Sequence, residues 1–256
     1  MTKKIAWDGT LVGAGAEALV AGKMIVGPTK VGYIVMVANA EGLRRKFDAK
    51  QRSLNKPAVV LCGSMAQLKE LAELNPEVEA YYQKHWDQDI LMGCILPWKQ
   101  SALDKLDPEV RELMTDTRDT SCFVIKFGTP SEQIVAHNWA NGQHLTFASS
   151  ANPSGKGNKG QVENIGERIE EFADMIIAAN DYVSSIQPYK SVETRYEQGV
   201  MVSMVDKDGK LIPEQGGERS ISPCPVLIRK GLDQDRILSI LAESFPSWDY
   251  RHGEYY

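Results

Sequence analysis

The sequence lacks the cysteine and histidine spacings that metal-binding and dithiol proteins require. Its four cysteines, Cys62, Cys94, Cys122 and Cys224, form no CxxC pair and have no histidine at ligand spacing. Three of them lie inside apolar runs. This distribution argues against a zinc finger or a redox dithiol and predicts free, buried thiols in a reducing compartment.

Long apolar runs are also missing. No stretch approaches the roughly 18 consecutive apolar residues of a membrane span. The first residues include Lys3 and Lys4 but are not followed by the apolar segment of a secretory signal. We therefore expect a cytoplasmic protein without a membrane partner.

The chain lacks an excess of positive charge. Its formal net charge is −5 and its isoelectric point is about 5.5. A chain of this charge has no overall attraction to phosphate backbones, which predicts weak or no direct nucleic-acid binding. With 256 residues, of which 43% are hydrophobic, it is long enough to bury a sizeable core.

What the sequence does contain is an alternation of helical and extended patterns. Helices are predicted at 13–21, 67–74 and 162–179, and strands at 23–29, 33–37, 57–62, 122–127, 145–150, 199–205 and 225–231. The polar segment 181–198 is expected to be irregular. This order predicts an α/β protein with a mixed, twisted sheet. Because no repeat or linker interrupts it, we expect one domain over 1–256, with a core at about 13–240 and a short C-terminal extension at 241–256.

The most informative stretch is 145–155, where an apolar run changes to small hydroxyl and amide residues followed by glycine. This is how a buried strand delivers a polar loop to a ligand. About a hundred residues upstream, Lys50 and Arg52 are spaced i, i+2. On an extended segment they would point to the same side and together grip a polyphosphate.

Two further basic features have open interpretations. Lys126 lies in an apolar run, where an ammonium group is costly unless it reaches solvent, a carboxylate or an anionic ligand. The glycine- and lysine-rich segment 156–160 either cradles phosphate with its amides or is a solvated linker.

These residues carry a family resemblance. Lys50-Gln51-Arg52 with the following segment to Pro57, and Ser150-Ala151-Asn152-Pro153-Ser154-Gly155, resemble the KxR and SxN signatures of the YrdC-like family. The best-known members of that family are threonylcarbamoyl-AMP synthases. Segments 23–33, 124–127 and 225–231 resemble its "PT(D/E)TxYGL", "VRVP" and "PxILRxG" elements, so the resemblance spans roughly residues 13 to 240.

The resemblance implies a twisted, largely open sheet with flanking helices and a positively charged, concave nucleotide cavity. There ATP, bicarbonate and L-threonine would become threonylcarbamoyl-adenylate and pyrophosphate, which are used in tRNA modification together with partners of that process. A carbamate that attacks the α-phosphate is an anion meeting an anion, so fixed positive charge is required, and Mg²⁺ would share that task.

The resemblance also implies roles for individual residues. Lys50, Arg52, Ser150 and Asn152 would be catalytic and bind the nucleotide, with Lys56 and Arg229 beside them. The acceptor amino acid, or another amine, would meet residues from the other motifs. These are Thr29, Tyr33, Lys126 and Ser149. No protein side chain is implied as a metal ligand.

The departures from the family pattern gather in the acceptor half. Lys30 stands where the family has an acid, and Val31 stands where it has a second threonine. Residues 89–95 take the place of its "PGPLT" segment, and Lys126 replaces its arginine. Polar residues that bind the substrate should not be substituted while the substrate stays the same, because the loss of each one leaves a buried polar group of the substrate unpaired. We therefore predict poor use of threonine and a preference for a more acidic partner that Lys30 or Lys126 would pair with.

Two alternatives from other functional classes stay open. One is a non-catalytic, double-stranded-RNA-binding module, and the other is a domain that handles a carbamoyl-adenylate for a carbamoyltransferase. The simplest interpretation of each marked residue is also structural. Asn152 would cap a turn, Arg52 would pair with a surface acid and Lys50 would be solvated.

Overall fold

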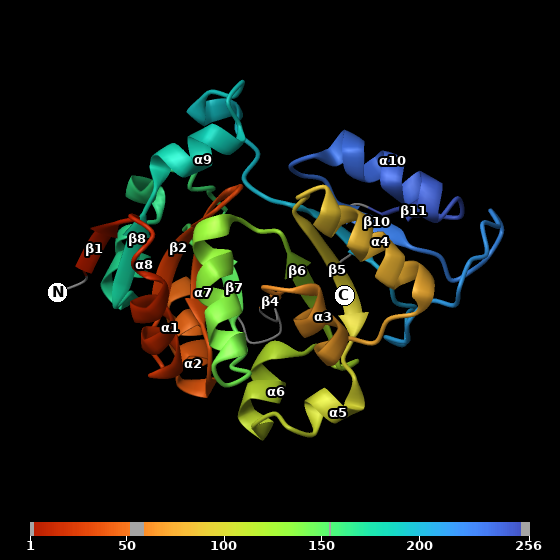
Figure 1. The fold of residues 1–256 in the computed structure, drawn as a ribbon, viewed down its shortest axis with the longest axis horizontal. Helices are drawn as coiled ribbons and strands as arrows, with labels where there is room; N and C mark the ends of the chain where they lie inside the picture. Colours follow the sequence, from red (N-terminus) through yellow and green to blue (C-terminus); the bar gives the residue numbers. More distant parts are fainter. Residues whose placement is uncertain (1–2, 52–58, 154, 252–256) are drawn as a thin grey trace.

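A computed structural model describes residues 3–51, 59–153 and 155–251. They form one eleven-stranded mixed sheet in the order β1-β8-β2-β3-β7-β4-β6-β5-β9-β10-β11, flanked by helices (Figure 1). The strands are β1 Lys3–Ala6, β2 Ile25–Thr29, β3 Gly32–Val37, β4 Val59–Leu61, β5 Met92–Pro97, β6 Thr120–Ile125, β7 Phe147–Ser150, β8 Met175–Ala178, β9 Val200–Ser203, β10 Val226–Arg229 and β11 Asp249–Tyr250. The predicted α/β class with a mixed sheet is confirmed.

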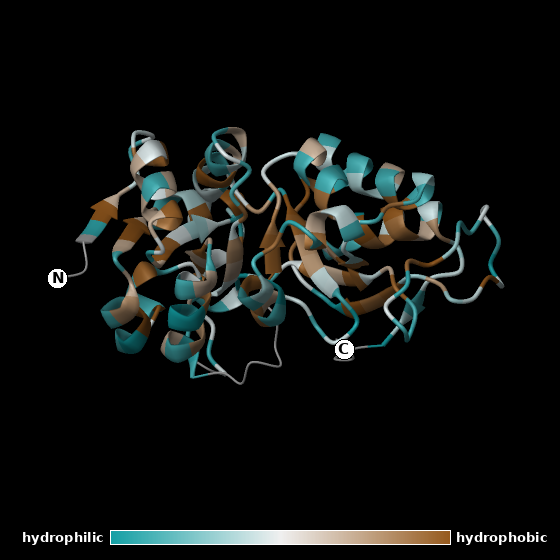
Figure 2. Cartoon of the chain, turned by 90° about the horizontal axis from the view of Figure 1, so that it is seen from below, coloured by the Kyte–Doolittle hydropathy of each residue, from teal (hydrophilic) through white to brown (hydrophobic). Residues whose placement is uncertain are grey.

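The helices lie on both sides of the sheet, and the apolar strands between them appear brown in Figure 2 while the helices present mostly polar outer surfaces. The α-helices are α1 Val12–Val20, α2 Ala40–Lys50, α3 Met65–Leu71, α4 Pro76–Asp87, α5 Gln100–Leu103, α6 Pro108–Met114, α7 Thr129–Ala140, α8 Glu167–Phe172, α9 Asn180–Ile186 and α10 Gln234–Ser244. Short 3₁₀ turns span Val162–Asn164 and Val192–Thr194.

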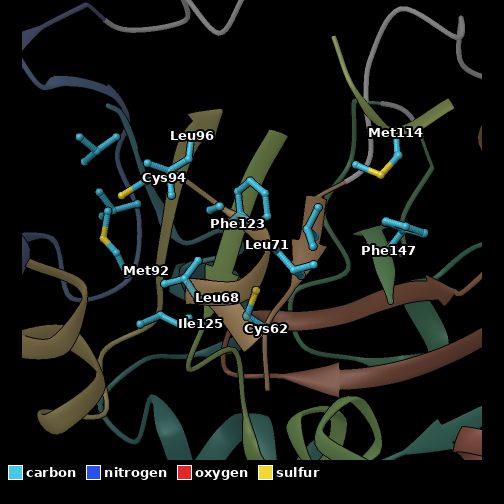
Figure 3. Close-up of a cluster of buried hydrophobic side chains, with 14 of the residues drawn as sticks. Cys62, Leu68, Leu71, Met92, Cys94, Leu96, Met114, Phe123, Ile125 and Phe147 are labelled. Atoms are coloured by element: carbon cyan, nitrogen blue, oxygen red, sulfur yellow. The ribbon is translucent and has the colours of Figure 1, made fainter. Parts of the chain in front are cut away.

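Alternation along the central strands separates a packed face from an open one. Met92, Cys94 and Leu96 of β5 point into a buried cluster that is completed by side chains of β6, β7, α3 and α6 (Figure 3). Gly93 of β5 and Val124 of β6 pair with each other and alternate onto the opposite face. That opposite face carries the cavity described below.

The sheet curls strongly. β2 and β6 are separated by three strands, yet Lys30 N, directly after β2, donates a hydrogen bond to Phe127 O, just past β6, at 2.8 Å. Gly128 has a φ of +133°, and a Cβ there would lie 3.0 Å from Lys30 N and 3.1 Å from Thr29 Cα. The close approach needs glycine. The end of β6 thus meets the β2–β3 turn and makes the open face concave.

The single helix predicted over 162–179 is wrong. Helix α8 ends at Phe172, and β8 follows as a strand between β1 and β2. Ile176 and Ile177 are β-branched and buried, and the position between two strands satisfies their backbone groups. Tertiary pairing has overridden the helical periodicity.

The extended conformation predicted at Lys50 is also wrong. Helix α2 begins after Asn39, whose side chain accepts from Gly42 N at 3.0 Å, and it runs to Lys50. Gln51 ends it in the left-handed region with φ 48°. The i, i+2 argument therefore does not apply, and Arg52 lies outside the described residues.

Segments outside the predicted core also join the sheet. The edge strands are β1 and β11, and helices α9 and α10 were not predicted as such. Among residues 3–51, 59–153 and 155–251, no helix is both long and apolar enough to cross a membrane.

Candidate functional site

A cavity of about 440 Å³ opens on the concave face. Five residues that the sequence assigned to the site line it. These are Thr29, Tyr33, Ser149, Ser150 and Arg229. The other described candidates, Lys50, Asn152 and Lys126, lie outside the lining, and Arg52 and Lys56 belong to a segment that the structure does not describe.

Lys50 and the SxN loop meet at one end of this cavity. The Lys50 ammonium donates to Ser150 O at 2.8 Å, to Asn152 O, and to Asn152 Oδ1 at 3.4 Å. Helix α2 ends at Lys50 and β7 ends at Ser150, so two segment ends place these groups together. The two signatures, separated by a hundred residues in sequence, therefore converge.

Asn158 organises the loop that follows, and sequence reasoning missed it. Its Nδ2 donates to Tyr33 O and Ala151 O, while its Oδ1 accepts from Tyr33 N and Gly160 N, all at 2.9 to 3.1 Å. The residue is buried, and it ties segment 156–160 to β3 and to the end of β7. The sequence signal for it was an amide directly after Gly157 in a glycine-rich segment.

The hydroxyls of Thr29 and Tyr33 are used within the protein. Thr29 Oγ1 donates to Gly32 O at 2.8 Å. The Tyr33 hydroxyl donates to Asn180 Oδ1 at 2.7 Å and accepts from Ala179 N at 2.8 Å. Burial raises the pKa of Tyr33 to about 12. Both residues line the cavity, but each hydroxyl is already hydrogen-bonded within the protein.

Ser149 and Arg229 supply different groups to the lining. Ser149 Oγ is buried and has no hydrogen-bond partner within the described structure. Arg229 is half-buried, and its Nε donates to Gly199 O at 3.0 Å, which fixes the guanidinium at the wall. Ser149 therefore contributes a hydroxyl and Arg229 a positive charge to this part of the wall.

Lys30 and Lys126 both pair with Asp89, in the loop between α4 and β5. Lys30 Nζ lies 2.9 Å from Asp89 Oδ2, and Lys126 Nζ lies 3.4 Å from Oδ1 and 4.4 Å from the centre of the Trp86 ring. Burial raises the pKa of Asp89, but the hydrogen bonds and charges of the lysines outweigh it and lower that pKa below its usual value.

The expectation of an acidic acceptor that pairs with these lysines stays a prediction, although both lysines already have a partner within the protein. Lys30 is almost fully buried, and neither lysine lines the cavity. The buried Lys30 and the partly exposed Lys126 are both paired with a carboxylate of the protein itself. Lys126 therefore reaches a carboxylate, which was one of the three outcomes expected for it.

The described residues hold no group of three histidine, cysteine, aspartate or glutamate side chains suited to a metal ion. Glu197 brings one carboxylate to the cavity, and its Oε1 accepts from Lys159 N at 2.8 Å. This donor set fits Mg²⁺ only as a companion of nucleotide phosphates, which would supply most of its oxygen ligands.

Comparisons with known proteins agree with the fold. The Sua5/YciO/YrdC family profile, described as "Telomere recombination", matches residues 17–189. SMU.1377c, a hypothetical protein from Streptococcus mutans UA159, is 60% identical over 100% of both chains with a TM-score of 0.94. No curated protein matches the chain in sequence.

Two more distant structures show the same fold. Sua5 from P. abyssi, complexed with L-threonine, is 19% identical with a TM-score of 0.63, and the match covers 95% of this chain and 61% of that one. Full-length HypF, in a phosphate- and nucleotide-bound form, is 17% identical with a TM-score of 0.56, covering 86% of this chain and 29% of that one. The chain thus spans under two thirds of Sua5 and under one third of HypF. On the profile match across most of its length, the chain belongs to the Sua5/YciO/YrdC family.

Proposed function

We propose that the cavity binds ATP and forms a carbamoyl-adenylate from ATP, bicarbonate and an amino acid. The observation that carries this proposal is the contact of Lys50 with Ser150 and Asn152 at the cavity's end. A cation held at a loop of carbonyl, amide and hydroxyl groups suits a phosphate chain.

The chemistry has two balanced steps. The amine attacks the carbon of bicarbonate, a C–N bond forms, and water leaves to give a carbamate. A carbamate oxygen then attacks the α-phosphorus of ATP, the bond from that phosphorus to the bridging oxygen breaks, and pyrophosphate leaves. No nucleophilic side chain is needed, so the protein's contribution is positioning and charge.

Each part of the site has a role in these steps. Lys50 would neutralise the phosphates, with Arg52 and Lys56 as further expected cations. Ser149, Ser150 and Asn152 would bind the nucleotide by hydrogen bonds. Arg229 would hold a carboxylate or a phosphate at the cavity wall. Mg²⁺ bound with ATP would reduce the charge of the phosphate chain.

The relatives support this assignment. Sua5 was solved with L-threonine and HypF with phosphate and nucleotide, which are ligands of the same chemical classes. HypF also favours a second candidate. A matching domain makes up only part of that much longer chain, so this protein would handle a carbamoyl-adenylate for a separate transferase.

The test is pyrophosphate release from ATP with bicarbonate and a panel of amino acids. The proposal expects release that requires both bicarbonate and an amino acid. ATP binding without release under any of these conditions would favour the second candidate. Failure to bind ATP, together with tight and salt-sensitive binding of duplex RNA, would favour the RNA-binding alternative.

A further inference from the structure

Two charged residues line the cavity in the described part of the chain, and they carry opposite charges. Glu197 lies just before β9, and Arg229 is the last residue of β10. Neither forms an ion pair with another described residue, whereas Lys30 and Lys126 share the carboxylate of Asp89. The cavity therefore presents one negative and one positive group that no described side chain neutralises.

Hydrogen bonds hold the backbone near these two residues in a fixed relation. Arg229 Nε donates to Gly199 O at 3.0 Å, and Gln198 Nε2 donates to Lys230 O at 2.9 Å. Because Glu197 is two residues from Gly199, their α-carbons are at most about 7 Å apart. The acidic and the basic side chain thus start from neighbouring points of the backbone and belong to the wall of the same cavity.

Segment 156–160 positions the Glu197 carboxylate. Its Oε1 accepts from Lys159 N at 2.8 Å, and the carboxylate lies so close to Gly157 that a Cβ at that position would clash with it. No described residue donates to Oε2, so this oxygen remains for a ligand. In the same way, Arg229 uses only its Nε within the described structure and keeps both terminal nitrogens of its guanidinium.

The two charges match those on the α-carbon of a free amino acid. A carboxylate repels the phosphates of a nucleotide and the carboxylate of an acceptor, so Glu197 is suited to a cation. A guanidinium binds a carboxylate through charge-assisted hydrogen bonds, so Arg229 is suited to an anion. The ammonium and the carboxylate of an amino acid are attached to one carbon, and a ligand that meets both residues is therefore fixed at that carbon.

We infer that Glu197 binds the α-ammonium group of the acceptor while Arg229 binds its α-carboxylate, so the acceptor is a free α-amino acid and not a simple amine or a peptide N-terminus. This inference rests on the proposed function and specifies its acceptor. Before the attack on bicarbonate the ammonium releases one proton to water, and the neutral amine still donates to the same carboxylate. Glu197 lies in the segment 181–198, which the sequence predicted only as irregular.

The experiment compares L-threonine, L-valine, L-glutamate and L-lysine with their α-amides, which keep the amine but lose the α-carboxylate, at saturating ATP and bicarbonate. The wild type should prefer the best amino acid to its amide by about 10- to 100-fold in kcat/KM. Arg229→Gln should bring this ratio close to one. Glu197→Gln keeps an oxygen for Lys159 N, and it should raise the KM for acid and amide alike by about tenfold, with the KM for ATP within about twofold. Glu193→Gln, at an exposed glutamate of the same segment, should match the wild type.

Each other outcome has a defined meaning. Equal use of an amino acid and its amide by the wild type would overturn the inference. A change in the Mg²⁺ or ATP requirement of Glu197→Gln, without a change for acceptors, would assign this carboxylate to the metal-bound nucleotide and overturn it as well.

If no compound supports turnover, the proposed function fails, and saturation-transfer NMR on the methyl groups of L-threonine and L-valine with ATP present decides the inference. Transfer in the wild type that is lost in both Glu197→Gln and Arg229→Gln would support it. Absence of transfer in the wild type, or transfer that either variant retains in full, would refute it.

Discussion

At one end of the cavity the Lys50 ammonium contacts oxygens of Ser150 and Asn152, whereas Lys30 and Lys126 share the carboxylate of Asp89. None of these three lysines lines the cavity, but Ser150, which Lys50 contacts, does. Lys30 and Lys126 instead meet an acidic side chain of the loop between α4 and β5. The comparison shows that a lysine in a family motif position is informative only once its partner is known.

The largest effect is expected from Lys50→Ala. Removing this cation from the proposed reaction centre should lower kcat/KM for ATP by about 100- to 1,000-fold, which corresponds to about 3–4 kcal/mol. The fold should be retained, as judged by circular dichroism. Lys23→Ala, at an exposed lysine between α1 and β2, serves as the matched control. Equal activity in the two variants would show that Lys50 has no greater role than an ordinary surface lysine.

Acid should destabilise the fold through His85, which precedes the loop that carries Asp89. This buried imidazole donates from Nδ1 to Tyr81 O at 2.7 Å, and burial lowers its pKa from 6.5 to about 4. The unfolded state then binds the proton more readily, so the stability is complete above pH 6.5 and declines as the pH falls towards 4. The total loss is about 3 kcal/mol.

Urea unfolding between pH 7 and 4 measures this effect. His85 O accepts from Ile90 N at 2.9 Å, so the same change should loosen the loop that carries Asp89. His85→Gln should flatten the pH dependence in this window, whereas His137→Gln, at an exposed histidine, should leave it as in the wild type. An unchanged slope in His85→Gln would show that the buried imidazole is not the group responsible.

Asp89→Asn should cost less, because this carboxylate is 65% exposed and therefore partly screened. Removing its charge leaves Lys30 buried without its counter-charge, and we expect a loss of about 1–2 kcal/mol in the free energy of unfolding. The variant should also lower kcat/KM for the acceptor more than for ATP. Asp208→Asn, in an exposed pair with Lys207, should leave the unfolding midpoint unchanged.

The smallest predicted effect is that of Arg229→Gln. The guanidinium belongs to a residue that lines the cavity, and its loss should raise the KM for the acceptor by about tenfold, or about 1.4 kcal/mol. The KM for ATP should change less. A change in the KM for ATP alone would show that Arg229 binds the nucleotide and not the acceptor.

Much of the framework was predictable from local pattern. Apolar runs bounded by glycine, proline and polar residues located most central strands, and the pairing of Lys50 with Asn152 followed from two short motifs. The failures occurred where tertiary contacts decide. The apolar residues of 175–178 continue a helical periodicity, and only their pairing with β1 and β2 makes them a strand. The Lys50 motif suggested an extended segment, and only the helix that begins after Asn39 shows that Lys50 is helical.

The acceptor end was harder to predict for a physical reason. Sequence shows that Lys30 and Lys126 are charged, but not that the sheet curls so that both reach Asp89. The same curl brings Val31, from the β2–β3 turn, and Val124, from β6, to the lining of one cavity. Their approach depends on strand order, which local periodicity does not encode.

The central claim is that this cavity joins bicarbonate carbon, an amine and AMP. Mass spectrometry of the nucleotide products formed from ATP, ¹³C-bicarbonate and a panel of amino acids tests it most directly. The account predicts an amino-acid carbamoyl-adenylate whose mass rises by one unit with the label, formed by the wild type and lost in Lys50→Ala. AMP and pyrophosphate appearing without any labelled adenylate, or the same adenylate formed equally by Lys50→Ala, would contradict it.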